Sequence, residues 1–72
     1  MDKIKPGIYR HYKGKEYMVF GVGFHEETHE KFVVYRALYD EYDLYVRPLA
    51  LFCEEAEVDG IKIPRYTCIK EL

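Results

Sequence analysis

Residues 16–24 read Glu16-Tyr17-Met18-Val19-Phe20-Gly21-Val22-Gly23-Phe24, and this stretch decides the fold. Aromatic and β-branched residues in such a short apolar run favour a strand over a helix. Alternate side chains of a strand point to opposite faces, so one face carries Met18, Phe20, Val22 and Phe24. We expect that face to form the core. The glycines on the other face, Gly21 and Gly23, predict a bulge, a sharp bend or a close backbone approach.

A second strand is predicted at residues 32–39, beyond a polar connection. Its apolar side chains also alternate, with Val33, Tyr35, Ala37 and Tyr39 on one face and Phe32, Val34 and Leu38 on the other. Arg36 falls on the face of Phe32. Either its stem packs near the strand end with the guanidinium in water, or a bulge shifts the register.

Shorter elements complete the sheet. Residues 8–12 and 44–47 are strand-like, and Asp59-Gly60 predicts a two-residue hairpin turn. The last strand is expected at residues 61–69, broken at Pro64. Pro48 fits the first position of a short helical turn over residues 49–53 that would close one end of a barrel.

These elements indicate a mainly β fold. About five short antiparallel strands with one short helical turn predict a small barrel or roll, because closure hides the edges of so small a sheet. Seventy-two residues are expected to form one domain, residues 1–72, which needs a dense core. Eight Tyr and four Phe supply large rings, and we expect most tyrosines to pack in the core and at the barrel rim.

The net charge of −2 conceals an uneven distribution along the chain. Residues 1–15 carry five basic side chains and one acidic side chain, whereas residues 16–72 carry six basic and twelve acidic ones. An acidic domain is a poor generic binder of nucleic acid, because that affinity depends on neutralising phosphates. The basic N-terminal third still leaves nucleic-acid binding, helped by aromatic stacking, as one alternative.

The two cysteines, Cys53 and Cys68, are too few for a disulfide scaffold. We expect both to be reduced and at least partly buried. The first six residues contain no apolar stretch that could act as a signal peptide, and no window is apolar enough to span a membrane. The sequence therefore predicts a cytoplasmic protein with no membrane partner.

One motif suggests catalysis. Residues 25–29, His-Glu-Glu-Thr-His, match the H-E-x-x-H motif of zinc proteases. In those enzymes the two histidines lie one helical turn apart on a shared metal, and the glutamate is the general base. Here the motif connects two predicted strands, which do not reproduce that geometry. We expect neither a metal nor another cofactor, but a polar loop over residues 25–30 in which Glu27, Thr28 and Glu30 stabilise the turn.

Several motifs resemble those of a bacterial family known as domain of unknown function 1653. They are Pro6-Gly7-Ile8-Tyr9-Arg10-His11-Tyr12-Lys13-Gly14, His25-x-Glu27-Thr28-x-Glu30, Val33-Val34-Tyr35-Arg36-x-Leu38-Tyr39, Arg47-Pro48-Leu49 with Phe52, and Asp59-Gly60 followed by Pro64-Arg65. The resemblance covers residues 6–66 and implies an SH3-like barrel, usually a short stand-alone bacterial protein, with no assigned activity. The family pattern requires neither Glu26 nor His29, which is a further argument against a zinc site.

The candidate site combines polar and aromatic side chains that we expect on one face: Arg10, His11, His25, Glu27, Thr28, Glu30, Tyr35, Arg47 and Arg65. Arg47 and Arg65 each adjoin a proline, an arrangement that presents a guanidinium fork rigidly to a carboxylate or phosphate. Both arginines could instead form ion pairs with the loop glutamates. His11 could equally be a half-buried packing residue.

Our preferred interpretation is a non-catalytic binding module whose partner is a protein or a small anionic ligand, acting as a monomer or weak homodimer. A groove of tyrosines for proline-rich peptides would be one form of it. The alternative from another class is a small hydrolase or nucleotide-handling enzyme that uses His25 and Glu27 as acid–base groups. That enzyme needs a concave site with the histidine and a carboxylate within hydrogen-bond reach.

Overall fold

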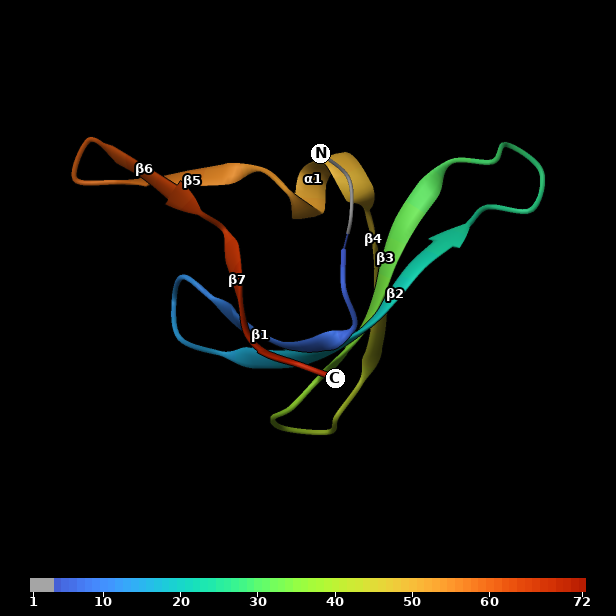
Figure 1. Cartoon of the computed structure of the whole chain (residues 1–72), viewed down its shortest axis with the longest axis horizontal. Coiled ribbons are helices and arrows are strands. Elements are labelled where there is room, and N and C mark those ends of the chain that lie inside the picture. The colour runs from blue at the N-terminus through green and yellow to red at the C-terminus, as the bar shows by residue number, and fades with distance from the viewer. Residues whose placement is uncertain (1–3) are drawn as a thin grey trace.

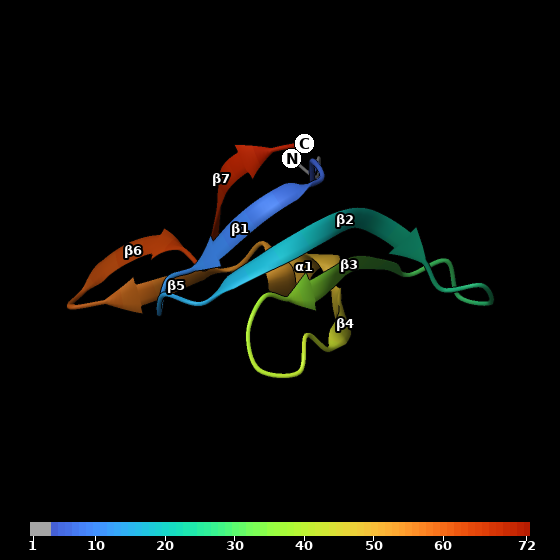
Figure 2. The ribbon, with the colours of Figure 1, turned by 90° about the horizontal axis from the view of Figure 1, so that it is seen from below.

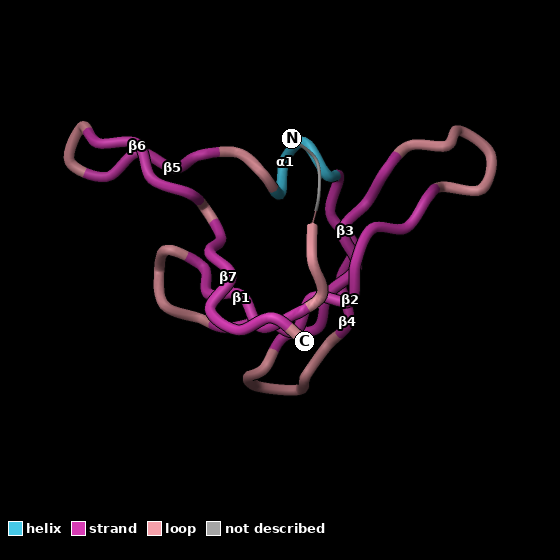
Figure 3. Tube along the Cα trace, in the orientation of Figure 1, coloured by secondary structure: helices cyan, strands magenta, loops and turns pink. Residues whose placement is uncertain are grey.

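Seven strands and one helical turn form the fold in a computed structural model, which describes residues 4–72 (Figures 1 and 3). In chain order they are β1 (Gly7–His11), β2 (Glu16–Phe24), β3 (Lys31–Ala37), β4 (Leu44–Pro48), α1 (Leu49–Phe52), β5 (Glu55–Val58), β6 (Ile61–Pro64) and β7 (Tyr66–Glu71). The main sheet is antiparallel, with the order β4-β3-β2-β1-β7. The predicted mainly β fold is confirmed, with seven strands within residues 4–72 in place of about five, and β5 and β6 form a separate hairpin.

The main sheet curls, and α1 lies over the opening of the curl (Figure 1). Figure 2 shows the same strands from below, with β7 and β4 at the two ends of the series. Leu49 and Phe52 of α1 are buried, as expected for a turn that closes one end of a barrel. Pro48 is the N-cap residue of α1, with φ −52° and ψ 136°, which are not helical angles. Its predicted place at the first helical position is therefore wrong. Among residues 4–72, no helix has the length and apolarity needed to cross a membrane.

The core lies against the face of β2 that we did not predict. Val19 is fully buried, whereas Phe20 is 49% exposed and Phe24 is 61% exposed. The cause is a bulge: Val19 pairs with Tyr35 and Gly21 pairs with Val34, which leaves Phe20 as the extra residue.

An extra residue reverses the alternation of side chains along a strand. Val19 before the bulge and Val22 after it therefore both pack toward the core. The predicted core set is wrong for Met18, Phe20 and Phe24 and right for Val22, because strict alternation was assumed through the bulge.

On β3 the buried face consists of Val33, Tyr35 and Ala37. Arg36 lies on the opposite face, where its guanidinium donates a hydrogen bond of 2.8 Å to the carbonyl of Tyr42. The side chains of β3 therefore alternate regularly through Arg36, and the strand contains no bulge at this position. The strand ends at Ala37, two residues earlier than predicted.

Aromatic rings fill the space between the sheet and α1. The rings of Phe52 and Tyr66 are stacked with centroids 4.0 Å apart, and Tyr66 also meets Tyr17 and Tyr35 edge to face. Tyr9 and Tyr35 are buried. The expected use of most tyrosines as packing residues is visible here, although Tyr42 and Tyr45 are exposed.

The predicted last strand is two strands in two different sheets. The strand is interrupted at Arg65. As a result, β6 pairs with β5, whereas β7 pairs with β1. The Asp59-Gly60 hairpin is confirmed, because Val58 pairs with Ile61 and both turn residues have positive φ, 52° and 79°.

The predicted burial of Cys53 and Cys68 is wrong, because both cysteines are exposed. Cys53 follows α1 directly, and Cys68 lies on the edge strand β7.

Gly21 has φ 140°, a conformation that side chains with a Cβ rarely adopt, and it forms the bulge. We expect Gly21→Ala to lower the free energy of unfolding by about 1–3 kcal/mol. Urea denaturation followed by circular dichroism measures the change. Gly23→Ala is the matched control, since its Cβ would only touch Val34 Cγ2 at an ordinary 3.4 Å. Equal effects of the two substitutions would contradict this explanation of the bulge.

Candidate functional site

The loop over residues 25–30 forms several hydrogen bonds within its own turn. His25 Nδ1 accepts hydrogen bonds from the N–H groups of Glu27 and Thr28, at 3.1 and 3.3 Å. Thr28 Oγ1 accepts one from the N–H of Glu30, at 3.2 Å. Thr28 thus accepts a hydrogen bond from a backbone N–H as predicted, whereas Glu27 and Glu30 contribute backbone N–H groups to these bonds and not the predicted carboxylates.

The H-E-x-x-H residues are not helical, as predicted, and all of them are exposed. The two histidines occupy a turn in which His29 has φ 63°, not adjacent turns of a helix. Within residues 4–72, no three His, Cys, Asp or Glu side chains are grouped so that they could hold a metal ion. The loop projects away from the body of the sheet (Figure 1).

The acid–base pair of the enzyme alternative is not assembled. His25 lines a cavity of about 230 Å³ together with Gly23, Phe24, Phe32, Val34 and Val46. This cavity is almost wholly apolar, and no carboxylate lines it. The contact between His25 and Glu27 runs through the backbone N–H of Glu27 and not through its carboxylate.

Arg10 is paired with a residue outside the candidate set. Its guanidinium forms an ion pair with Glu16 on the neighbouring strand, with Nη2 2.9 Å from Oε2. Both side chains are largely exposed, and such pairs contribute little to stability. The adjacent cavity of about 300 Å³ is lined by Arg10 and His11 with residues of β6 and β7.

Four of the predicted residues are linked to Tyr66 or to one another: His11 and Tyr35 contact the Tyr66 ring, and the charges of Arg47 and Arg65 act on His11. The Tyr66 ring centroid lies 5.0 Å from that of His11 and 6.1 Å from that of Tyr35. We call these five residues the arginine cluster.

The two arginines of the arginine cluster lie on different elements. Arg47 is paired with buried Val33 in the β3–β4 ladder, so both side chains leave the sheet on its inner face. Arg65 lies at the junction of β6 and β7, with its guanidinium carbon 5.8 Å from the ring centroid of Tyr12.

The charges of both arginines act on His11. Burial lowers the pKa of His11, and the positive charges of Arg65, Lys13 and Arg47 lower it further. His11 Nδ1 accepts a hydrogen bond of 3.1 Å from the N–H of Lys13, which a protonated ring nitrogen could not do. His11 is therefore neutral at pH 7, and its proton is on Nε2.

Arg47 also faces the hydroxyl of Tyr35. Burial raises the pKa of Tyr35, and the neighbouring Tyr66 hydroxyl raises it further. The charge of Arg47 acts in the opposite direction, because a cation favours the phenolate. A positive potential thus extends from His11 to Tyr35 across the arginine cluster.

Two guanidinium nitrogens lack a protein acceptor. Arg47 Nε and Arg65 Nε are the buried side-chain polar atoms in residues 4–72 that have no hydrogen-bond partner. The carboxylate of Glu54 lies 3.9 Å from Arg65 Nη2, too far for a hydrogen bond. An unpaired buried donor costs about 1–3 kcal/mol, so both arginines could gain from an added acceptor.

The nine predicted residues therefore separate into three groups. The arginine cluster contains His11, Tyr35, Arg47 and Arg65, and the loop contains His25, Glu27, Thr28 and Glu30. Arg10 belongs to neither group, although it lines a cavity with His11. The ion pairs that we considered between the two arginines and the loop glutamates do not occur within residues 4–72. Lys3 of the basic N-terminal third lies outside the described residues.

Sequence reasoning missed Tyr66, although its ring contacts both His11 and Tyr35. Residues 61–69 were treated as one strand, so the face on which Tyr66 lies could not be assigned. The Pro64-Arg65 pair was the available signal, because a proline often ends a strand.

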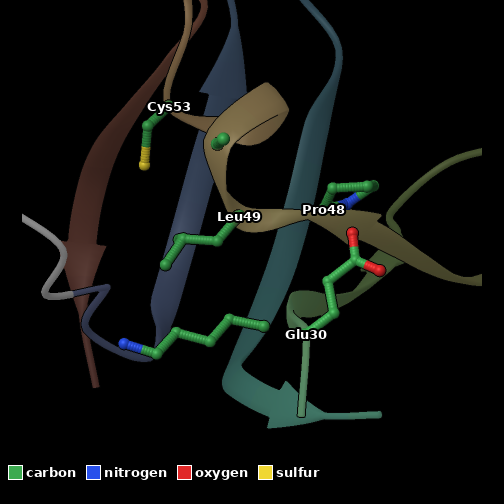
Figure 4. Close-up of a pocket in the computed structure, with 6 residues that line it drawn as sticks. Glu30, Pro48, Leu49 and Cys53 are labelled. Atoms are coloured by element: carbon green, nitrogen blue, oxygen red, sulfur yellow. The ribbon is translucent and has the colours of Figure 1, made fainter. Parts of the chain in front are cut away.

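The largest of the cavities described here, about 370 Å³, lies beside α1 and includes Glu30 (Figure 4). Leu49 and Cys53 reach it from α1 and the residue after it, and Glu30 reaches it from the loop before β3 (Figure 4). Its lining includes Glu30 and Lys31, two side chains of opposite charge. This cavity lacks the unpaired buried donors of the arginine cluster.

Comparison with known proteins gives two matches. A family described as "Protein of unknown function (DUF1653)" matches residues 7–68. The crystal structure of a DUF1653 protein from Bordetella bronchiseptica is similar with a TM-score of 0.84 and 32% sequence identity, over 96% of this chain and 91% of that chain. Among curated proteins, no relative matches the chain.

The pKa of His11 tests the electrostatics of the arginine cluster. We expect Arg65→Gln to raise it toward 6.5 without reaching that value, because burial still favours the neutral ring. An NMR titration of the imidazole protons measures the shift.

Since the folded pKa is the lower one, the unfolded chain binds the proton first as pH falls. The free energy of unfolding should therefore decrease as pH falls from about 6.5 toward the folded pKa, and less so in the variant. Arg36→Gln, on the opposite face, should leave the pKa of His11 unchanged. An unshifted His11 pKa in Arg65→Gln would show that the guanidinium does not act on the ring.

Proposed function

Because this chain belongs to DUF1653, a family of proteins of unknown function, we propose its function from its own geometry: it is a binding module that holds an anionic group between Arg47 and Arg65. The observation that carries the proposal is the pair of buried Nε donors without an acceptor. A carboxylate or phosphate supplies the missing acceptors.

Arginine suits this role better than lysine would. Its planar fork donates two parallel hydrogen bonds to a carboxylate or phosphate, and it stays charged at any physiological pH. Each of these arginines adjoins a proline, Pro48 or Pro64, whose ring limits the motion of the backbone there. A guanidinium on a restricted backbone loses less entropy when it binds.

The aromatic rings around the arginine cluster strengthen the attraction. Tyr35 is 6% exposed, and Tyr66 is stacked on buried Phe52. Rings of this kind exclude water, and charge-assisted hydrogen bonds are stronger in a low dielectric. The Arg65 side chain is only 25% exposed, so its charge is less screened than that of Arg10 at 53%.

His11 contributes as a neutral donor. Its Nε2–H is the remaining polar group of the ring, because Nδ1 is already bonded to the N–H of Lys13. A neutral histidine adds a hydrogen-bond donor without adding charge repulsion toward the two arginines.

We prefer a binding role to catalysis because the arginine cluster lacks an acid–base pair. Its titratable groups are two arginines, a neutral histidine, and tyrosines, of which Tyr35 has a raised pKa. None of these is a nucleophile activated by a neighbouring base at pH 7. The partner is then a small anionic ligand or a protein that presents a carboxylate or phosphate.

The test is a titration of the ¹⁵N-labelled domain with inorganic phosphate and, separately, with acetate, followed by two-dimensional NMR. We expect shifts confined to the backbone and side-chain signals of the arginine cluster. Arg47→Gln and Arg65→Gln should each weaken binding by about tenfold, since each removes one charged donor pair. Arg36→Gln removes an arginine from the opposite face and should bind like the wild type.

The same titration separates the other functions. If added zinc shifts the signals of His25 and His29, the loop binds a metal. If a single-stranded oligonucleotide shifts signals, and the shifts become smaller as the salt concentration rises, the domain binds nucleic acid. The proposal is rejected if neither phosphate nor acetate at about 50 mM shifts the signals of the arginine cluster, because a weaker site would have no biological use.

A further inference from the structure

The strand β4 forms an open edge of the main sheet. It is the terminal strand of the sheet order, and within residues 4–72 no strand pairs with its outer side. Leu44, Tyr45 and Val46 are exposed by 54%, 42% and 64%. The opposite edge, β7, carries Lys70 and Glu71 and pairs with β1 through a bulge, two devices that discourage further pairing.

The hydrogen-bonding groups on the open edge can be identified. The N–H of Ala37 donates to the carbonyl of Asp43 at 2.9 Å, in register with the β3–β4 ladder. In an antiparallel ladder such pairs alternate, so Tyr45 and Arg47 also bond to β3. The N–H and C=O groups of Leu44 and Val46 therefore point outward.

The position of Pro48 agrees with this assignment of the outward-pointing backbone groups of β4. It alternates with Leu44 and Val46, so its missing N–H lies on the outward side, where proline is tolerated. The open edge thus offers two N–H groups in β4, those of Leu44 and Val46.

We propose that β4 pairs antiparallel with β4 of a second copy of this chain, about a two-fold axis at Tyr45. Leu44 then lies opposite Val46 of the second copy, and Val46 lies opposite its Leu44. Each pair exchanges two backbone hydrogen bonds, which gives four in total. All outward N–H groups of both β4 strands are used.

Neighbouring two-fold registers use fewer of these groups. An axis at Leu44 would need the N–H of Tyr42, which already donates to the carbonyl of Tyr39 at 3.0 Å. An axis at Val46 would place Pro48, which has no N–H, opposite Leu44 of the second copy. The register at Tyr45 is therefore the one that the backbone selects.

Side chains favour the same register and the same partner. Asp43 lies opposite Arg47 of the second copy, so two pairs of opposite charge form at the ends of the shared ladder. Leu44 and Val46 face their apolar counterparts on the outer face. The two Tyr45 rings meet in the central, closely spaced pair, where aromatic contacts are favourable.

The proposal of this dimer does not rest on the anion site proposed above. Five residues of edge strand from each copy make a small interface, which fits a weak and reversible dimer. Arg47 belongs to both surfaces, so an anion bound to it competes with Asp43 of the second copy.

Sedimentation equilibrium tests the proposal on the whole chain, because a dimer has twice the monomer mass of 8.7 kDa. We expect a concentration-dependent dimer below about 1 mM. Val46→Pro removes an N–H that bonds to nothing in the monomer, and it should raise the dissociation constant by about tenfold or more. Val46→Thr keeps the N–H and the branched side chain and should dimerise like the wild type.

Amide hydrogen exchange locates the interface. The N–H groups of Leu44 and Val46 should become protected as concentration rises, while that of Tyr45 is protected throughout. Circular dichroism confirms that Val46→Pro still folds. A mass of 8.7 kDa up to about 1 mM, or a Val46→Pro variant that dimerises like the wild type, would overturn the proposal.

Discussion

An extra residue in β2 is the constraint on which the rest of the structure depends. Because Phe20 is the extra residue, Val19 and Val22 both face the core, and neither half of this long strand exposes its inner side. A bulge also bends the sheet, and in the curved sheet Tyr9 of β1 and Tyr35 of β3 both pack against Phe52 of α1. The inner face of the curved sheet is the surface from which Arg47 and Tyr35 project.

Much of the fold could be predicted from the sequence, because strands and turns depend on local composition. The alternation of residues 32–39 and the Asp59-Gly60 turn located their elements to within a few residues. The core face of β2 could not be predicted in the same way. Gly21 and Gly23 indicated a bulge, but its position relative to Tyr35 depends on pairing with another strand, which alternation alone does not reveal.

The candidate site was predicted in part for the same reason. His11, Tyr35, Arg47 and Arg65 come from four distant segments, and their motifs suggested a role but not their position. The loop residues from His25 to Glu30 are neighbours in sequence, yet their hydrogen bonds go to the loop itself. A short polar motif is therefore weaker support for a site than an arginine whose buried donor has no acceptor.

The return of β7 to β1 has a consequence for folding. The strands β1 to β4 can form as successive hairpins, but pairing Tyr9 with Cys68 must close a loop that contains most of the chain. Loop closure of this length is slow and entropically costly, so we expect β7 to dock late in folding. Arg65 and Tyr66 lie at the start of that strand, so the proposed anion site is complete only in molecules that have finished folding.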